Sequence, residues 1–364
     1  MSSRPLVALV CALLGLGLVS TAVRRVVPWP DGFAIREKLE ALRRQADEVD
    51  LLFVGSSIVH HGVRPAVLDP ALAEAGLDVR SFNLGVGGMS AFEADHLLDE
   101  VLSWELPELD WVCVELRPFH GRIQGANAFT ERQLRWHDPA RTAAAMAVVL
   151  GDDRPLEARL TDAWTHLRLG ARWLTNYGLG RTIVEAAVGP SHDAELADRL
   201  EASRGYLALE ELAPDDPDVA ARRQALLDDP QAFARGVASQ DARNRSPVSP
   251  AAKDLAVLRD QQARIRAAGA EPLLFVPPSL MASPLAQWMA EEDEPDLYLF
   301  NSPRRFPALF QLEHHWDRNH LNLAGASLFS RDLAAALAPR LSGATPAQLR
   351  ARARARRLGQ DEGD

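Results

Sequence analysis

The sequence predicts an α/β fold in which a parallel sheet is covered by helices on both faces. Short uninterrupted apolar runs, the pattern of strands buried on both faces, recur along the chain at residues 51–54, 79–84, 111–116, 272–276 and 297–300. Helical patterns lie between several of these runs, and strand–helix alternation indicates a parallel sheet. Apolar residues make up 47% of the chain and charged residues 25%, as in ordinary globular proteins.

Length, charge and cysteine content exclude several classes of protein. The 364 residues are enough for a large buried core, in one large domain or two small ones. The net charge of −10 argues against a general nucleic-acid binder, which needs a basic face to neutralise phosphates. Cys11 and Cys113 are the only cysteines, which excludes a disulfide scaffold and a multi-cysteine zinc site.

The N-terminal segment, residues 1–27, contains an uncharged and almost wholly apolar run from Leu6 to Val23. This run is just long enough to cross a hydrocarbon core, and Arg24 and Arg25 follow it, so we expect a transmembrane anchor. A cleaved signal peptide is the second interpretation, since small residues at 20–22 suit a cleavage site. A buried core helix is the third.

The rest of the chain divides by composition and pattern. Residues 28–47 have apolar side chains at helical spacing, which predicts an amphipathic linker helix. Residues 48–342 form the predicted sheet domain, and a helical insertion interrupts it at 125–250, where no strand pattern occurs. The insertion is either a cap over the carboxyl edge of the sheet or packing bulk. Residues 343–364 form a charged tail, typical of a solvated chain end.

The first segment with chemical potential follows the first predicted strand. That strand stops at Gly55, Ser56 and Ser57 come directly after it, and Pro65 stands where a helix can begin. A serine in a turn from strand to helix is exposed, and a helix N-terminus favours developing negative charge. Ser57 is therefore a candidate nucleophile.

The second segment is a glycine-rich stretch after the second predicted strand. Gly85, Gly87 and Gly88 allow the backbone to approach a ligand closely. Ser90 and Glu93 have the spacing of a capping box, so the amide of Gly88 lies just before a helix start, a natural anion site. A dinucleotide site is disfavoured, because position 90 is Ser where G-x-G-x-x-G requires Gly.

The third segment lies near the C-terminus. Asp317 and His320 are three residues apart, so their side chains face the same way on a helical turn. A carboxylate beside an imidazole fixes the tautomer of the ring and stabilises its charged form. Asn322 is placed to cap a following helix from Leu323 to Leu337. The alternative for Asp317 and His320 is a surface ion pair.

Together the three segments resemble the SGNH (GDSL-like) hydrolase superfamily of serine esterases and acyltransferases, in its membrane-anchored bacterial type. Gly55-Ser56-Ser57 is similar to the first block of that family, with Ser56 in place of its Asp. Asn83 to Gly88 is similar to the second block, and Asp317 to Asn322 with Gly325 to the last. The resemblance covers roughly 48–120 and 255–340, and it implies a flavodoxin-like three-layer α/β/α fold.

The resemblance also implies a mechanism. Ser57 attacks an ester carbonyl, His320 is the general base that takes its proton, and Asp317 orients His320. Backbone amides of Ser57 and Gly88 form the oxyanion hole. The third block of the family supplies an Asn after the next strand, but this chain has Arg117 there. Either Arg117 donates in place of the Asn, or this donor is lost. Loss of one oxyanion donor typically costs about 10²–10³-fold in turnover.

Further expectations concern the substrate. Asn83 and Ser56 are candidate substrate-binding residues, although Ser56 also fits a hydrogen-bonding neighbour of the nucleophile. No cofactor or metal is expected. The substrate class that the resemblance suggests is acyl esters of a small molecule or a cell-surface polysaccharide in the bacterial cell envelope. The catalytic domain is then extracytoplasmic, in the periplasm or at the cell surface, and attached to the membrane by the N-terminal helix.

Two other functions stay open. A metal-dependent hydrolase would use the adjacent pairs His60-His61 and His314-His315 with Asp317 and His320, although neighbours on a strand point to opposite faces. A catalytically inactive SGNH-like protein would bind glycan or assemble a surface polysaccharide, and the missing Asn of the third block favours this alternative.

Overall fold

The structure, a computed structural model, describes residues 4–26, 34–123, 130–180, 182–184, 193–246 and 252–343. The chain forms two compact units, each described here by itself. The sheet unit comprises Glu37–Pro118, Ala194–Pro250 and Leu258–Asp364. The helical unit comprises Met1–Arg36, Phe119–Asp193 and Ala251–Val257.

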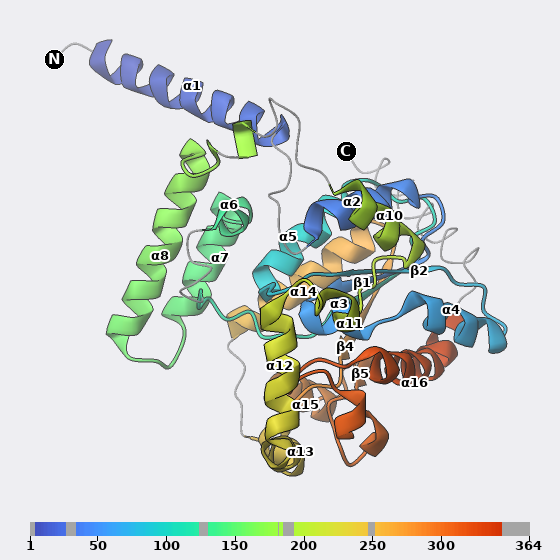
Figure 1. The fold of residues 1–364 in the computed structure, drawn as a ribbon. Helices are drawn as coiled ribbons and strands as arrows, with labels where there is room; N and C mark the ends of the chain where they lie inside the picture. Colours follow the sequence, from blue (N-terminus) through green and yellow to red (C-terminus); the bar gives the residue numbers. More distant parts are fainter. Residues whose placement is uncertain are drawn as a thin grey trace. The chain divides into compact units, whose positions relative to one another are not determined.

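The sheet unit contains five parallel strands in the order β2-β1-β3-β4-β5 (Figure 1). Their bounds are β1 Leu51–Gly55, β2 Ser81–Gly85, β3 Trp111–Glu115, β4 Glu271–Val276 and β5 Leu297–Leu299. In the register, Leu51 of β1 lies between Ser81 and Trp111. All five strands coincide with the apolar runs of the sequence to within about two residues, so the predicted α/β class with a parallel sheet is confirmed.

The strands β1 to β4 are buried on both faces, as continuous apolar runs require. On one face, Phe53 and Phe275 belong to a core that includes Leu68 of α4 (Pro65–Glu74) and Phe329 of α16 (Leu323–Ser342). Right-handed crossovers from β1 to β2 and from β2 to β3 run in opposite directions along the sheet, so α5 (Ala91–Leu102) covers the other face. Each fully buried Leu or Phe contributes about 1.5–3 kcal/mol.

Predicted helix starts are confirmed by their caps. Ser90 Oγ accepts the Glu93 N–H at 3.3 Å, and Glu93 Oε2 accepts the Ser90 N–H at 2.9 Å, which closes the capping box of α5. Asn322 Oδ1 accepts the Gly325 N–H at 2.9 Å at the start of α16. Pro65 opens α4. These caps fix where the loops at the carboxyl edge of the sheet end.

The remaining elements of the sheet unit are helical. They are α2 (Ile35–Arg44), α3 (Ser57–Gly62), α10 (Ala194–Ala202), α11 (Leu209–Leu212), α12 (Pro217–Asp228), α13 (Pro230–Asn244), α14 (Ala252–Ala267), α15 (Pro284–Glu291), η2 (Pro307–Phe310) and η3 (Leu312–His314). Helices α2 and α14 begin in the helical unit. The linker helix, expected over 28–47, is α2, and residues 28–33 of that prediction lie outside the described residues.

The predicted insertion, 125–250, contains no strand in its described residues, as expected. It does not form one body, however, because its part from Ala194 onward belongs to the sheet unit. The helical unit holds α1 (Arg4–Val26), α6 (Glu131–Arg135), α7 (Pro139–Leu150) and α8 (Leu156–Thr175). The predicted tail, from residue 344 onward, lies outside the described residues.

The N-terminal apolar run forms the helix α1, and Asn176 after α8 donates its side-chain N–H to the carbonyl of Ser20 at 3.1 Å. Among the helices of the described segments, none is long and apolar enough to span a membrane. The transmembrane part of the prediction is therefore not confirmed. It depended on a run, Leu6 to Val23, at the lower limit of the length that a hydrocarbon core requires.

Candidate active site

The structure brings the three predicted segments together at the carboxyl edge of the sheet. Ser57 follows β1, the loop with Gly88 follows β2, and His320 lies in the loop before α16. The Oγ atom of Ser57 is 2.8 Å from Nε2 of His320, although 263 residues separate them in the chain. Ligands of open parallel sheets bind at this edge, so the position suits a functional site.

Ser57 is the first residue of the short helix α3, and its neighbour Ser56 is the N-cap. Ser56 Oγ accepts the Ile58 N–H at 3.3 Å and donates to Oε1 of Glu115 at 3.1 Å. The other carboxylate oxygen of Glu115 accepts the Ser56 N–H at 2.6 Å. These bonds fix the turn that presents Ser57, whose own amide, at the first helical position, has no intrahelical acceptor. Ser56 thus has the role of a hydrogen-bonding neighbour.

His320 and Asp317 form the second link. Nδ1 of His320 donates to Asp317, with both carboxylate oxygens at 2.9 Å. Since Nδ1 carries the proton, the lone pair of Nε2 faces Ser57. Burial raises the pKa of Asp317, but the hydrogen bond and charge of His320 and the N–H groups of Asn319 and His320 outweigh burial and lower this pKa to about 2. Asp317 is therefore a carboxylate at neutral pH.

Helix α12, part of the predicted insertion, holds the loop that carries Asp317. Trp316 donates its indole N–H to a carbonyl of α12 at 3.0 Å, and Arg223 donates to the carbonyl of His315 at 2.5 Å. Arg222 lies 3.3 Å from Oδ2 of Asp317, as an ion pair. This part of the insertion therefore contacts the site rather than serving only as packing bulk.

His61 lies beside the base without competing with it. Its ring centroid is 5.8 Å from that of His320, and its Nδ1 donates to the carbonyl of Leu207 at 2.7 Å. Burial, and next the nearby His320, lower the pKa of His61 to about 3. A neutral His61 at pH 7 places no fixed positive charge beside His320.

A fully buried lysine and a fully buried asparagine hold the glycine-rich loop in place by hydrogen bonds to its backbone. Lys38 donates to the carbonyls of Asn83, at 2.9 Å, and Gly85, and burial lowers the pKa of this lysine well below its usual range. Asn83 donates from Nδ2 to the carbonyls of Val59 and Val63 at 2.8 and 2.6 Å, and its Oδ1 accepts the Gly85 N–H. Asn83, a candidate substrate contact in the sequence, thus joins α3 to the loop and leaves no exposed polar atom for a ligand.

Gly88 adopts a φ of +65°, a conformation that residues with a Cβ rarely adopt. Arg117, after β3, donates from Nη1 to the carbonyl of Met89 at 2.6 Å. This bond ties the end of β3 to the loop that presents Gly88. Arg117 therefore lies next to the predicted oxyanion loop, and one of its N–H groups is occupied by the protein. Its role as an oxyanion donor stays a prediction.

The side chains of the alternative metal site are not arranged as a ligand group in the described residues. His314 Nδ1 bonds to the carbonyl of Ala308 at 2.6 Å, and His315 Nε2 bonds to that of Leu309 at 2.9 Å. Within the described residues, no group of three or more His, Cys, Asp or Glu side chains is arranged to hold a metal ion. Three imidazoles of the proposed ligand set, His61, His314 and His315, thus bond to backbone carbonyls.

Sequence reasoning missed three residues that shape this site. Glu115 ends β3, and a carboxylate at the carboxyl end of a buried strand is a signal that was open to use. Lys38 lies among buried positions of an amphipathic helix, which is a weaker signal. Arg222 gave no signal, because its contact with Asp317 depends on tertiary packing between segments distant in the sequence.

Comparisons with known proteins do not assign the chain to a family. Neither the protein-family models nor the curated proteins contain a match to this chain. Fold and site together define an α/β protein with a hydrogen-bonded Ser–His–Asp chain at the carboxyl edge of a five-stranded parallel sheet.

Proposed function

We propose that this protein is a serine-dependent esterase or O-acyltransferase of the SGNH type, acting on acyl esters. The observation that carries the proposal is the hydrogen-bonded chain Ser57–His320–Asp317, with Ser57 half-buried and His320 in the required tautomer. A serine hydroxyl is a weak nucleophile until a base accepts its proton, and a carboxylate-oriented imidazole is the base that this chemistry uses.

The reaction proceeds in two halves. In the first, Ser57 Oγ bonds to the ester carbonyl carbon while His320 Nε2 takes its proton, and Asp317 stabilises the imidazolium. The carbon–oxygen bond to the leaving alcohol then breaks, His320 returns the proton to that oxygen, and an acyl-enzyme remains. In the second, water or a sugar hydroxyl attacks the acyl carbon, gives its proton to His320, and Ser57 leaves with that proton.

The negative charge of each tetrahedral intermediate requires donors aimed at the oxyanion. Amides of Ser57 and Gly88 supply two donors in this proposal. Arg117 supplies the third through an N–H group other than the one bonded to Met89. A cationic donor differs from the family's Asn in charge and reach, so we expect a turnover below that of members with the Asn.

The substrate class belongs to the proposal too. Acyl groups of a cell-surface polysaccharide are the substrate that the resemblance to membrane-anchored SGNH proteins suggests. An envelope enzyme of this type works on the extracytoplasmic side, in the periplasm or at the cell surface. Neither statement follows from the fold alone, because one fold supports many substrates.

A catalytically inactive glycan-binding or polysaccharide-assembly protein is the second candidate. The absence of an Asn after β3 favours it, together with the bond that occupies one N–H of Arg117. The two candidates differ in one measurable property, the nucleophilicity of Ser57.

Labelling with a fluorophosphonate probe tests the proposal. We expect covalent capture of the folded wild type, and loss of capture in Ser57→Ala and in His320→Ala. Ser103→Ala, at an exposed helix end, is the matched serine control and should label like the wild type. Absence of labelling in a wild type with an intact thermal transition would contradict the enzyme and favour the binding protein.

A further inference from the structure

A hollow lies at the carboxyl end of β5, on the same edge of the sheet as Ser57. Its volume is about 300 Å³, at the lower end of the range for small-ligand sites. The residues around it include three arginines, one aspartate and two asparagines: Arg245, Arg304, Arg305, Asp241, Asn244 and Asn301. Neither the fold nor the proposed triad requires this composition.

The charges of the hollow are unbalanced. Asp241 is its only carboxylate, and Oδ2 of Asp241 accepts the backbone N–H of Arg304 at 3.3 Å. Across the described segments, no carboxylate lies within 4.0 Å of the guanidinium of Arg245, Arg304 or Arg305. The excess of positive charge stands out in a chain whose net charge is −10.

The floor of the hollow is fixed by reciprocal amide bonds. Asn244 Nδ2 donates to the carbonyl of Asn301 at 2.9 Å, and Asn301 Nδ2 donates to Asn244 Oδ1 at 3.1 Å. Asn244 Oδ1 also accepts the Ser283 N–H at 3.1 Å. Both asparagines are buried, so the hollow has a preformed base, and little ordering is needed when a ligand binds.

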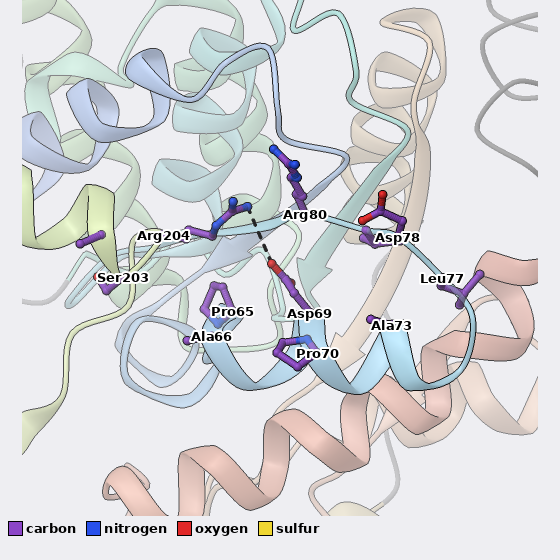
Figure 2. Close-up of a pocket in the computed structure, with 12 residues that line it drawn as sticks. Pro65, Ala66, Asp69, Pro70, Ala73, Leu77, Asp78, Arg80, Ser203 and Arg204 are labelled. Carbon is purple, nitrogen blue, oxygen red and sulfur yellow. Dashed lines mark ion pairs between the residues drawn. The ribbon is translucent and has the colours of Figure 1, made fainter.

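A second hollow, of about 320 Å³, lies near the amino end of β2 and shows the opposite arrangement (Figure 2). Arg204 faces Asp69 at 3.8 Å and Glu48 at 3.7 Å. Arg80 bonds to Glu48 at 2.8 Å. The arginines of that hollow have carboxylates within 4.0 Å, so the absence of such partners at β5, among the described residues, is a specific feature and not a general property of hollows here.

The sheet order sets the separation between the hollow at β5 and the triad. β5 is three strands from β1 in the order β2-β1-β3-β4-β5. At a strand spacing of about 4.8 Å, the two positions are roughly 14 Å apart along the edge. A small acyl ester at Ser57 does not reach that far, whereas a polymer of several sugar units does.

We infer that the hollow at β5 is a subsite for a carboxylate of an acidic polysaccharide whose acyl ester is presented to Ser57. This inference rests on the proposed function and narrows its substrate to a polyanionic glycan. The planar fork of arginine matches a carboxylate with two parallel hydrogen bonds, and three such groups around one hollow favour a uronate unit over a neutral sugar.

Calorimetric titration of the full chain carrying Ser57→Ala tests the subsite without turnover. The probes are an oligogalacturonate, a neutral maltooligosaccharide of equal length and inorganic phosphate. We expect binding of the oligogalacturonate, no measurable binding of the neutral sugar, and weak binding of phosphate. The double variant Arg304→Glu/Arg305→Glu should weaken oligogalacturonate binding by about 100-fold, since it removes two charged donors and adds two charges that repel the uronate.

The matched control is Arg331→Glu, which reverses an exposed arginine on α16 and should leave oligogalacturonate binding unchanged. Equal binding of the neutral sugar, or unchanged binding by the double variant, overturns the inference. Phosphate binding as tight as that of oligogalacturonate also overturns it, because the hollow is then a simple anion site. Fluorophosphonate labelling of the wild type separates the two proposals: failed labelling with intact uronate binding rejects the enzyme and keeps the glycan subsite.

Discussion

Two hollows of similar size lie at opposite ends of the parallel strands, one at the amino ends (the amino edge) and one at the carboxyl ends (the carboxyl edge). Their charged residues are arranged in opposite ways. Near the amino end of β2, the arginines that line a hollow of about 320 Å³ lie beside carboxylates, Arg204 beside Asp69 (Figure 2) and Arg80 beside Glu48. At the carboxyl end of β5, about 300 Å³ is lined by arginines without carboxylate partners within the described residues. Volume therefore does not distinguish the two hollows; what distinguishes them is whether their arginines have carboxylates within 4.0 Å among the described residues.

The carboxylates at the two ends of the strands differ in how well the protein stabilises their charge. Burial raises the pKa of Asp69, at the amino edge, to about 6, although hydrogen bonds from Ser81 and the charge of Arg204 act in the opposite direction. At the carboxyl edge, hydrogen bonds and the charge of His320 outweigh burial, and the pKa of Asp317 falls to about 2. The amino edge tolerates a poorly stabilised carboxylate, whereas the carboxyl edge holds one ionised beside a base.

Among matched substitutions at the two edges, those of Asp317 and Asp69 should differ most in their effect on the labelling of Ser57. In Asp317→Asn the amide no longer holds the proton on Nδ1 of His320, so Nε2 no longer accepts from Ser57. We expect the rate of fluorophosphonate labelling to fall by on the order of 10⁴-fold. Asp69→Asn, the matched change at the amino edge, should leave this rate within about twofold of the wild type. Similar losses in both variants would show that Asp317 acts through stability alone.

A glycine with positive φ at each edge allows a second comparison of how matched substitutions affect labelling. Gly88→Ala places a Cβ at a φ of +65° and displaces the predicted oxyanion amide, which should slow labelling by about 10²–10³-fold. Gly76, near the amino end of β2, has a φ of +79°, and a Cβ added there would meet no atom within 4 Å. Gly76→Ala should therefore cost about 1 kcal/mol of stability while labelling is retained. Unchanged labelling in Gly88→Ala would remove this amide from the oxyanion hole.

The pH dependence of stability should have opposite signs at the two edges. Since the pKa of Asp69 is raised in the folded state, its contribution is fully present below about pH 4 and is lost as pH rises through 6. The stability of Asp69→Asn relative to the wild type should thus improve by at most about 3 kcal/mol between pH 4 and 7. Asp317, with its lowered pKa, contributes stability above about pH 4 that is lost as pH falls through 2.

Chemical denaturation at several pH values measures this effect. The control is Asp78→Asn, an exposed carboxylate that lines the same hollow. If the difference in free energy of unfolding between Asp69→Asn and the wild type does not change with pH, the pKa of Asp69 is not raised in the folded state. Asp69 is then as well solvated as an ordinary surface carboxylate.

The sequence predicted the parts of this arrangement that depend on local patterns. Apolar runs located the strands, and caps such as Ser90 and Asn322 located the helix starts. Asp317 and His320 were recognised because their spacing in sequence determines their contact. The pairing of arginines at one edge and its absence at the other was not predictable, because each partner comes from a different segment. Glu115 is a different case: its place at the end of a buried strand was a usable signal, but its bonds to Ser56, which join β3 to the end of β1, depend on tertiary packing.

The smallest expected effect concerns Arg222, which joins the insertion to the triad. Its side chain is 45% exposed, so water screens the ion pair with Asp317, and pairs of this kind contribute about 0.2–1 kcal/mol. Arg222→Ala should slow labelling by no more than about fivefold, and Arg222→Lys should restore most of the loss, because a positive charge near Asp317 is what matters. A larger loss of labelling rate that Arg222→Lys does not restore would indicate a directional hydrogen bond from Arg222 to the substrate. Arg222 would then join the triad and the arginines at β5 as a substrate-binding group at the carboxyl edge.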